Sequence, residues 1–188
     1  ERTRVVFFLF FSRIFCFMHV QSDVCIIGDG AIGKAAALGF AQAGLKVALL
    51  SPASAPVPAP KEDWDVRVYA VNHVAHALLS SVKVWEALDA SRVAPVDAMV
   101  VNGDGATAGE LAFDAYGARV GALAWIVEDR NLNQALDAAL KFASNVKVIH
   151  GRASALQASD TAASVQLANG DTLGAELVVG ADGGQSWV

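Results

Sequence analysis

Hydrophobic positions near the start of the chain form two short runs separated by a helical pattern. Residues 24–27 are apolar, and three of the four are β-branched. An alanine-rich stretch then ends at Gly44, and residues 46–50 form a second, largely apolar run. Short apolar runs are typical of buried strands, and the stretch between them is typical of a helix. The pattern predicts a strand, a helix and a strand, which favours a parallel sheet with a right-handed crossover.

Further helices are predicted along the chain. Helical stretches are expected around residues 73–79 and 84–88, and an amphipathic helix over residues 131–143, where leucines recur every four positions. Residues 51–60 contain four prolines and three alanines, a composition compatible with neither a helix nor a central strand. That segment is expected to be a surface loop.

Short strands alternate with turns in the rest of the chain, and Asn169-Gly170 has the sequence of a hairpin turn. The expected strands cover residues 65–71, 98–101, 110–115, 122–127, 146–149, 153–158, 164–167 and 177–179. The fold class is therefore α/β, with a parallel sheet and an antiparallel, strand-rich excursion over residues 95–127.

The composition fits one domain, or a large piece of one, in a chain of 188 residues. A formal net charge of -5 provides no basic surface for a polyanion, so no nucleic acid partner is expected. The two cysteines are Cys16 and Cys25, and Cys25 lies in an apolar run where a thiol packs as a small hydrophobe. This usage favours a reducing, cytoplasmic compartment.

Residues 1–17 are expected to be a non-native or upstream segment. Their apolar run is shorter than the ~20 residues that span a bilayer, and no small-residue cleavage site of a signal peptide precedes Asp23. A natural start at Met18 would leave a short polar lead before the first strand.

A glycine-rich turn follows the first strand, with Gly28, Gly30 and Gly33 in the sequence GDGAIG. This spacing lets the chain turn tightly, bring its backbone against a pyrophosphate and pack the next helix close to the sheet. We call residues 28–33 the glycine turn. The fingerprint also expects an acid at the end of the second strand to bind the ribose, and Ser51 stands there instead. The glycine turn alone therefore leaves the choice of adenine dinucleotide open.

Three later segments, residues 65–72, 125–130 and 180–186, occur in order after the glycine turn. Together the four segments resemble the ubiquinone-biosynthesis hydroxylases, FAD-dependent aromatic monooxygenases related to para-hydroxybenzoate hydroxylase. The resemblance implies a Rossmann-like FAD-binding domain. It makes residues 18–188 the N-terminal part of that domain, with the excursion reaching toward a substrate domain.

The resemblance also implies roles for individual residues. The three glycines would hold the FAD pyrophosphate, and Ser51 replaces the usual ribose-binding glutamate. Arg67 would approach the flavin side, and Arg130 would lie close to the cofactor. Asp182 and Gly183 match a second motif associated with FAD and with nicotinamide nucleotide use. The two arginines have an alternative interpretation as solvated surface cations, and Asp182 as a residue that turns the chain after its strand.

The implied reaction uses NAD(P)H to reduce FAD and transfers one oxygen atom from dioxygen to a small aromatic substrate, a prenylated phenol in this branch. A peripheral position at the inner membrane, or a complex with other ubiquinone-pathway enzymes, is a further implication. No catalytic residue is identified. Because the family continues beyond Val188, the chain alone is expected to bind FAD weakly or not at all and to lack hydroxylase activity.

Two alternatives remain open from the sequence: a nicotinamide-dependent dehydrogenase with the same opening fold, and a non-catalytic nucleotide-binding subunit. A metal site is not expected, because His73 and His76 lie on one helical face without the further ligands that a tetrahedral site needs.

Overall fold

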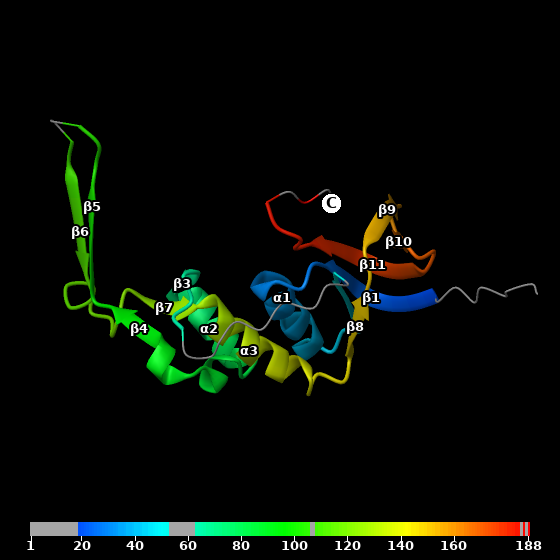
Figure 1. Ribbon diagram of the computed structural model, residues 1–188, viewed down its shortest axis with the longest axis horizontal. Helices are drawn as coiled ribbons and strands as arrows, with labels where there is room; N and C mark the ends of the chain where they lie inside the picture. The colour runs from blue at the N-terminus through cyan, green and yellow to red at the C-terminus, as the bar shows by residue number, and fades with distance from the viewer. Residues whose placement is uncertain (1–18, 53–62, 106–107, 185, 187) are drawn as a thin grey trace, which may run out of the picture.

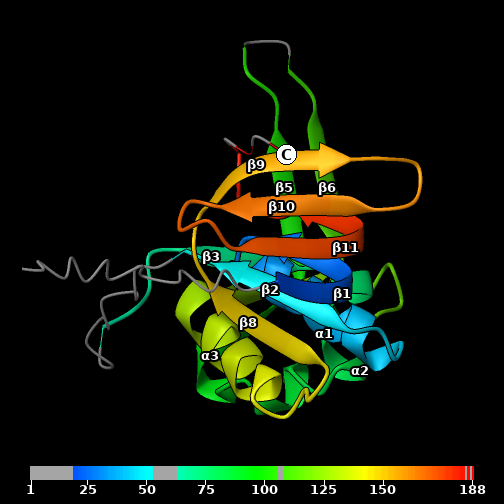
Figure 2. The same cartoon turned by 90° about the vertical axis from the view of Figure 1, so that its right-hand side faces the viewer.

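The computed structural model describes residues 19–52, 63–105, 108–184, 186 and 188. Its largest element is a six-stranded sheet in the order β8-β2-β1-β11-β10-β9, which Figure 2 shows from β8 at the bottom to β9 at the top. The strands are β1 (His19–Ile27), β2 (Val47–Ser51), β8 (Val146–His150), β9 (Ala153–Ala158), β10 (Ala163–Leu167) and β11 (Thr172–Gly180).

The first four strands in that order are parallel, which confirms the predicted parallel sheet. Strand β1 pairs in parallel with β2 on one side and with β11 on the other, and β2 pairs in parallel with β8. Helix α1 (Ala31–Gln42) connects β1 to β2, as the hydrophobic pattern predicted. Strands β10 and β9 continue the sheet in antiparallel fashion, with the predicted turn at Asn169-Gly170 joining β10 to β11.

Side chains of β1 alternate between two hydrophobic clusters, as the two-residue period of a strand requires. Val24 and Ile26 pack in the cluster that contains Ala37 of α1. Cys25 and Ile27 pack on the other side, in a cluster that includes residues of β10 and β11. Cys25 is fully buried, which confirms its predicted role as a small hydrophobe.

The helices gather on one side of the six-stranded sheet (Figure 2). Helices α2 (His73–Ser81) and α3 (Asp129–Leu140) share a third hydrophobic cluster with Leu38 of α1. Both were predicted, although α3 begins two residues earlier and ends three residues sooner than expected. The predicted helical stretch over residues 84–88 is only a short 3-10 helix, Trp85–Ala87, and a second one covers Ala90–Arg92.

An antiparallel region lies at the far end of the helices from the six-stranded sheet (Figure 1). It comprises a sheet in the order β3-β7-β4, built from β3 (Val68–Val71), β4 (Val93–Val96) and β7 (Ala124–Glu128), and a hairpin of β5 (Ala98–Asn102) and β6 (Glu110–Asp114). The predicted antiparallel strands are thus confirmed. Strand β4 was not predicted, because Pro95 weakens its strand signal, and it lies at an edge, where proline is tolerated. The assignment of residues 95–127 to a substrate domain stays a prediction.

Three predicted boundaries need correction. Strand β1 begins at His19 rather than at residue 24, because residues 19–22 pair with β11. Ser51 is the last residue of β2 and is buried, so it does not belong to the proline-rich loop. Strand β11 is nine residues long rather than three, because it pairs with β1 on one side and β10 on the other. Residues 53–60 of the expected loop and residues 1–17 lie outside the described residues. Within the described part of the chain, no helix is long and apolar enough to cross a membrane.

Candidate nucleotide-binding site

The carboxyl ends of three parallel strands meet beside the glycine turn. The backbone N–H of Gly28 donates to the carbonyl oxygen of Leu50 at 2.9 Å, which ties the turn to β2. The N–H of Ala181 donates to the carbonyl oxygen of Ile27 at 2.7 Å, which ties the segment after β11 to β1. Ligands of open α/β sheets bind at this edge, outside the carboxyl ends of the strands.

A cavity of about 480 Å³ opens at this edge. Four segments line it: the glycine turn with Gly28, Asp29 and Gly30; the end of β2 with Leu50 and Pro52; the β8–β9 connection with Gly151, Arg152 and Ala153; and the segment after β11 with Ala181, Asp182 and Gly183, together with Ile27 of β1. Segments far apart in the sequence therefore form one site.

The structure requires glycine for a different reason at each of two predicted positions, and the third position is open. Gly28 has φ +110°, and a Cβ there would collide with the carbonyl oxygen of Ala181. A Cβ at Gly33 would collide with the carbonyl oxygen of Gly28, so α1 can begin this close to the turn only with glycine. Gly30 is different, because a Cβ there would meet no atom within 4 Å. The surface at Gly30 is open, as an approaching phosphate requires.

The N-terminus of α1 faces this open surface. Gly30 caps the helix without a side-chain hydrogen bond, and no acidic residue lies in the first turn. The first N–H groups of a helix have no intrahelical partner and carry a partial positive charge, which makes them an anion-binding group. The glycine turn and this helix end together fit the pyrophosphate of a dinucleotide.

Ser51 and Asp29 form a hydrogen bond behind the cavity. The Ser51 Oγ lies 2.5 Å from Oδ2 of Asp29 and donates to it. Ser51 is only 5% exposed and does not line the cavity, whereas Asp29 does. The residue predicted at the ribose position therefore supports a neighbouring carboxylate, which the sequence analysis did not single out.

Arg67 and Arg130 are brought together around a different residue, Asp65. The backbone N–H of Arg67 donates to Oδ1 of Asp65, and that of Arg130 to Oδ2, each at 3.0 Å. These two hydrogen bonds lower the pKa of Asp65 below its ordinary value. Arg130 is the second residue of α3, so Asp65 caps that helix from outside. Neither arginine lines the cavity.

Lys34 links α1, which begins at the glycine turn, to α3, whose N-terminus is capped by Asp65. Its Nζ lies 2.7 Å from Oδ1 of Asp137 and donates to Oδ1 of Asn133 at 3.1 Å, both on α3. The N-terminal half of α1 is thus fixed beside the middle of α3. The glycine turn and the group around Asp65 lie at the N-termini of these two packed helices, and they form separate sites.

Asp182 and Gly183, the residues of the second predicted motif, line the same cavity, and the backbone of Asp182 lies beside Gly28. Both are exposed, and Gly183 has φ +95°, a conformation that favours glycine. The structure brings these two residues together with Gly28 and Gly30. Their contact with a cofactor stays a prediction.

His73 and His76 contact aromatic rings. The ring of His76 stacks on Trp125 with centroids 4.5 Å apart, and Nε2 of His73 lies 2.8 Å from the carbonyl oxygen of Ala122. Over the residues that the structure describes, no group of three or more His, Cys, Asp or Glu side chains could hold a metal ion.

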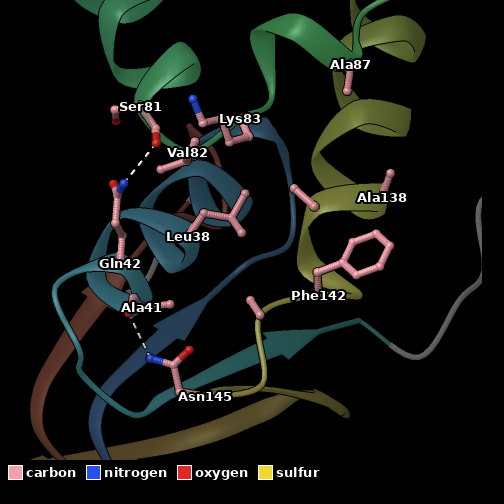
Figure 3. A pocket seen from close by; sticks show the side chains of 12 residues that line it. Leu38, Ala41, Gln42, Ser81, Val82, Lys83, Ala87, Ala138, Phe142 and Asn145 are labelled. Carbon is pink, nitrogen blue, oxygen red and sulfur yellow. Dashed lines mark hydrogen bonds between the residues drawn. The ribbon is translucent and has the colours of Figure 1, made fainter.

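A second hollow of about 440 Å³ lies at the opposite end of α1 (Figure 3). Apolar side chains such as Leu38, Val82 and Phe142 form most of its wall. Its amides are already paired: Gln42 Nε2 donates to the carbonyl oxygen of Ser81 at 2.8 Å, and Asn145 Nδ2 to that of Ala41 at 2.9 Å. The hollow is therefore mainly apolar, and both of its amide side chains are already hydrogen-bonded.

Asp29 and Arg152 are the polar cavity residues that sequence reasoning missed. The available signal for Asp29 was its place between two glycines of the fingerprint, two residues past the end of β1. Arg152 follows β8 without any motif, so the sequence carried no signal for it.

Comparison with known proteins places this architecture in a family. The family described as glucose inhibited division protein A matches residues 23–188, nearly all of the described chain. The chain belongs to this family.

Two curated relatives are hydroxylases by name. The chain is 34% identical over 169 residues to 3-demethoxyubiquinol 3-hydroxylase of Escherichia coli, a match covering 89% of this chain and 42% of that protein. It is 30% identical over 170 residues to ubiquinone hydroxylase UbiL of Rhodospirillum rubrum, covering 89% and 38%. The chain thus spans about two fifths of the length of these relatives. The predicted resemblance to ubiquinone-biosynthesis hydroxylases is confirmed.

Solved structures share the fold. PqsL of Pseudomonas aeruginosa, in a mutant form, superposes with a TM-score of 0.68 at 21% identity, covering 89% of this chain and 44% of that one. The flavin-dependent monooxygenase PieE, solved with FAD and substrate, gives 0.67 at 16% identity, covering 89% and 31%. The predicted fold class, α/β with a parallel sheet and an antiparallel excursion, is confirmed.

Proposed function

We propose that this chain is the cofactor-binding part of an FAD- and NAD(P)H-dependent monooxygenase that hydroxylates an aromatic ring, a polyprenylphenol of ubiquinone biosynthesis. The observation that carries the proposal is the open surface at Gly30. It lies at the N-terminus of α1, on a cavity bounded by the carboxyl ends of β1, β2 and β11. The 34% identity to 3-demethoxyubiquinol 3-hydroxylase supports ring hydroxylation as the reaction. The fold shared with PieE, which was solved with FAD, supports FAD as the occupant.

The chain's own residues would bind and orient the cofactor. Backbone N–H groups at the start of α1 stabilise the pyrophosphate charge, and Gly30 leaves room for it. Asp182 and Gly183 line the same cavity and would contact the remainder of the cofactor. Arg67 and Arg130 would lie near the flavin half, with their backbone fixed by Asp65. Bound FAD would supply the oxygen-activating chemistry.

Substrate, reductant and location belong to the proposal as well. The substrate is a small aromatic molecule with a prenyl tail, and NAD(P)H supplies the electrons. A polyprenylated substrate partitions into lipid, so we propose a peripheral position at the inner membrane, or a complex with other enzymes of the pathway, in a cytoplasmic setting.

Binding is tested by titrating the protein encoded by the whole gene with FAD, following quenching of flavin fluorescence, and by gel filtration of the mixture. The expected result is co-elution of flavin with protein, and competition by ADP. Binding of NAD in place of FAD would instead support a dehydrogenase, and absence of binding to either would contradict the proposal.

Activity is tested by introducing the whole gene into a bacterial strain that makes no ubiquinone because it lacks the corresponding hydroxylase. The expected result is restored ubiquinone, together with incorporation of one atom of labelled dioxygen into the ring. Accumulation of the unhydroxylated prenylphenol despite stable, flavin-loaded protein would contradict the proposed reaction.

A further inference from the structure

The glycine turn carries a carboxylate directed to the end of the neighbouring strand. β1 and β2 are adjacent and parallel, with Ile27 paired to Leu50, so the residues that follow this pair lie close together. Ser51 is the last residue of β2 and Asp29 is the second residue after β1, and their side chains meet in the 2.5 Å hydrogen bond. The sequence fingerprint expects a ribose-binding acid at the position of Ser51.

We propose that Asp29, positioned by Ser51, binds the ribose hydroxyls of the adenosine half of the nucleotide. The proposal rests on the proposed nucleotide-binding function and names the residue that replaces the missing acid. The carboxylate is delivered from the glycine turn rather than from the end of β2, and it reaches the same corner of the site.

The hydrogen-bonding capacity of the pair supports this assignment. A serine hydroxyl has one proton, and the proton of Ser51 is directed to Oδ2 of Asp29 at 2.5 Å in preference to the carbonyl oxygen of Pro52 at 3.3 Å. No residue in the described ranges donates to Oδ1 of Asp29. A carboxylate accepts at both oxygens, so Oδ1 can accept from a sugar hydroxyl while Oδ2 stays bound to Ser51.

Exposure assigns different roles to the two residues. Asp29 is partly exposed and lines the cavity, whereas Ser51 is 5% exposed and lies behind it. Asp29 can therefore touch a ligand directly, and Ser51 acts through Asp29 as a positioning residue. Asp29 directly precedes Gly30, the residue that caps α1, so its carboxylate lies close to the start of that helix. A nucleotide whose phosphates bind at the start of α1 would therefore place its adenosine ribose near this carboxylate.

The test measures binding of ADP, 2′-deoxy-ADP and 3′-deoxy-ADP to the protein encoded by the whole gene by calorimetry. Because a hydrogen bond to a charged acceptor contributes strongly to binding, removal of the contacted hydroxyl is expected to weaken binding to the unmodified protein about tenfold or more. Asp29→Asn should weaken ADP binding by a similar factor and bind all three nucleotides almost equally. Asp160→Asn, a change in the exposed turn between β9 and β10, should behave like the unmodified protein.

A double variant that moves the acid to another position distinguishes loss of ribose recognition from general damage to the glycine turn. Asp29→Ala combined with Ser51→Glu returns the acid to the end of β2 and should recover both ADP affinity and discrimination against a deoxy analogue. Thermal unfolding of each variant checks that the site is intact. If ADP binds but neither deoxy analogue is discriminated, the inference is wrong and the proposed function stands. If neither ADP nor FAD binds, both are wrong.

Discussion

Lys34 of α1 and Asp137 of α3 form an ion pair that joins the two helices. The Nζ–Oδ1 distance is 2.7 Å, and the Lys34 side chain is only 11% exposed while that of Asp137 is 53% exposed. A nearly buried ammonium needs partners, because desolvation without them is costly. Asn133 supplies a second acceptor at 3.1 Å.

Asp137→Asn is expected to lower the free energy of unfolding by about 1–2 kcal/mol, between the values for exposed and for buried ion pairs, because the ammonium keeps only neutral acceptors. Urea unfolding at low salt measures the change. Glu176→Gln, on the exposed part of β11, is the matched control and should leave stability within about 0.5 kcal/mol. A loss as small for Asp137→Asn as for the control would contradict the role of the pair.

Gly30 and Gly33 are expected to respond in opposite ways to alanine. Gly33→Ala places a methyl group against the carbonyl oxygen of Gly28 and should destabilise the fold by about 3 kcal/mol. Gly30→Ala meets no protein atom and already has an ordinary φ of −67°, so stability should change by less than about 0.5 kcal/mol.

The same pair of variants distinguishes a ligand surface from a structural turn. Gly30→Ala should weaken FAD or ADP binding at least tenfold, because the methyl group occupies space needed by the pyrophosphate. Unfolding curves and calorimetric titrations of both variants give the comparison. Normal nucleotide affinity in a well-folded Gly30→Ala protein would show that the ligand does not approach this residue.

Asp65 is expected to make stability depend on pH. Its pKa is lowered from 3.8 by hydrogen bonds from the backbone of Arg67 and Arg130. A lowered pKa means that the folded state favours the ionised form, so the contribution is complete above pH 3.8 and is lost as the pH falls through the lower folded value.

Asp65→Asn should therefore cost about 1 kcal/mol near pH 7, because the amide has one acceptor oxygen for the two backbone N–H donors and because solvent screens the charge of this partly exposed carboxylate. The difference from the unmodified protein should shrink below pH 3.8. Thermal unfolding between pH 2.5 and pH 7 measures it, with Asp160→Asn as control. A difference that is constant over this range would mean that the carboxylate charge has no part in the capping.

Cys25 is expected to resist thiol reagents in the folded protein. Burial raises the pKa of its thiol from 9.0 to about 11, and the side chain is 0% exposed. The thiolate is the reactive form, so both its scarcity and its inaccessibility slow labelling.

Labelling is measured with a maleimide at pH 8 in a Cys16→Ser background, where Cys25 is the single remaining thiol. The native rate should be at least a hundredfold below the rate in denaturant, since a rise of about two pKa units alone lowers the thiolate fraction by about that factor. Equal rates before and after denaturation would place Cys25 at the surface.

The local pattern of the sequence was sufficient for the first βαβ unit and for most other elements. Apolar runs and helical spacing depend on neighbouring residues, and so do the requirements of a tight turn such as Gly28 to Gly33. Boundaries set by distant pairing were harder. β11 extends from Thr172 because β1 and β10 pair with it on either side. β4 forms because it pairs with β7, and its position at the edge of that sheet tolerates Pro95.

The sequence by itself determined the fold class, the family resemblance and the turn that can hold a pyrophosphate, because these depend on residue type and short-range spacing. Only the tertiary structure decided which side chains share the cavity. It separated Arg67 and Arg130 from the glycine turn, and buried Ser51 behind Asp29. The physical reason is that the parallel pairing of β1 with β2 and β11 fixes which loops meet, and that register is a long-range property of the folded chain.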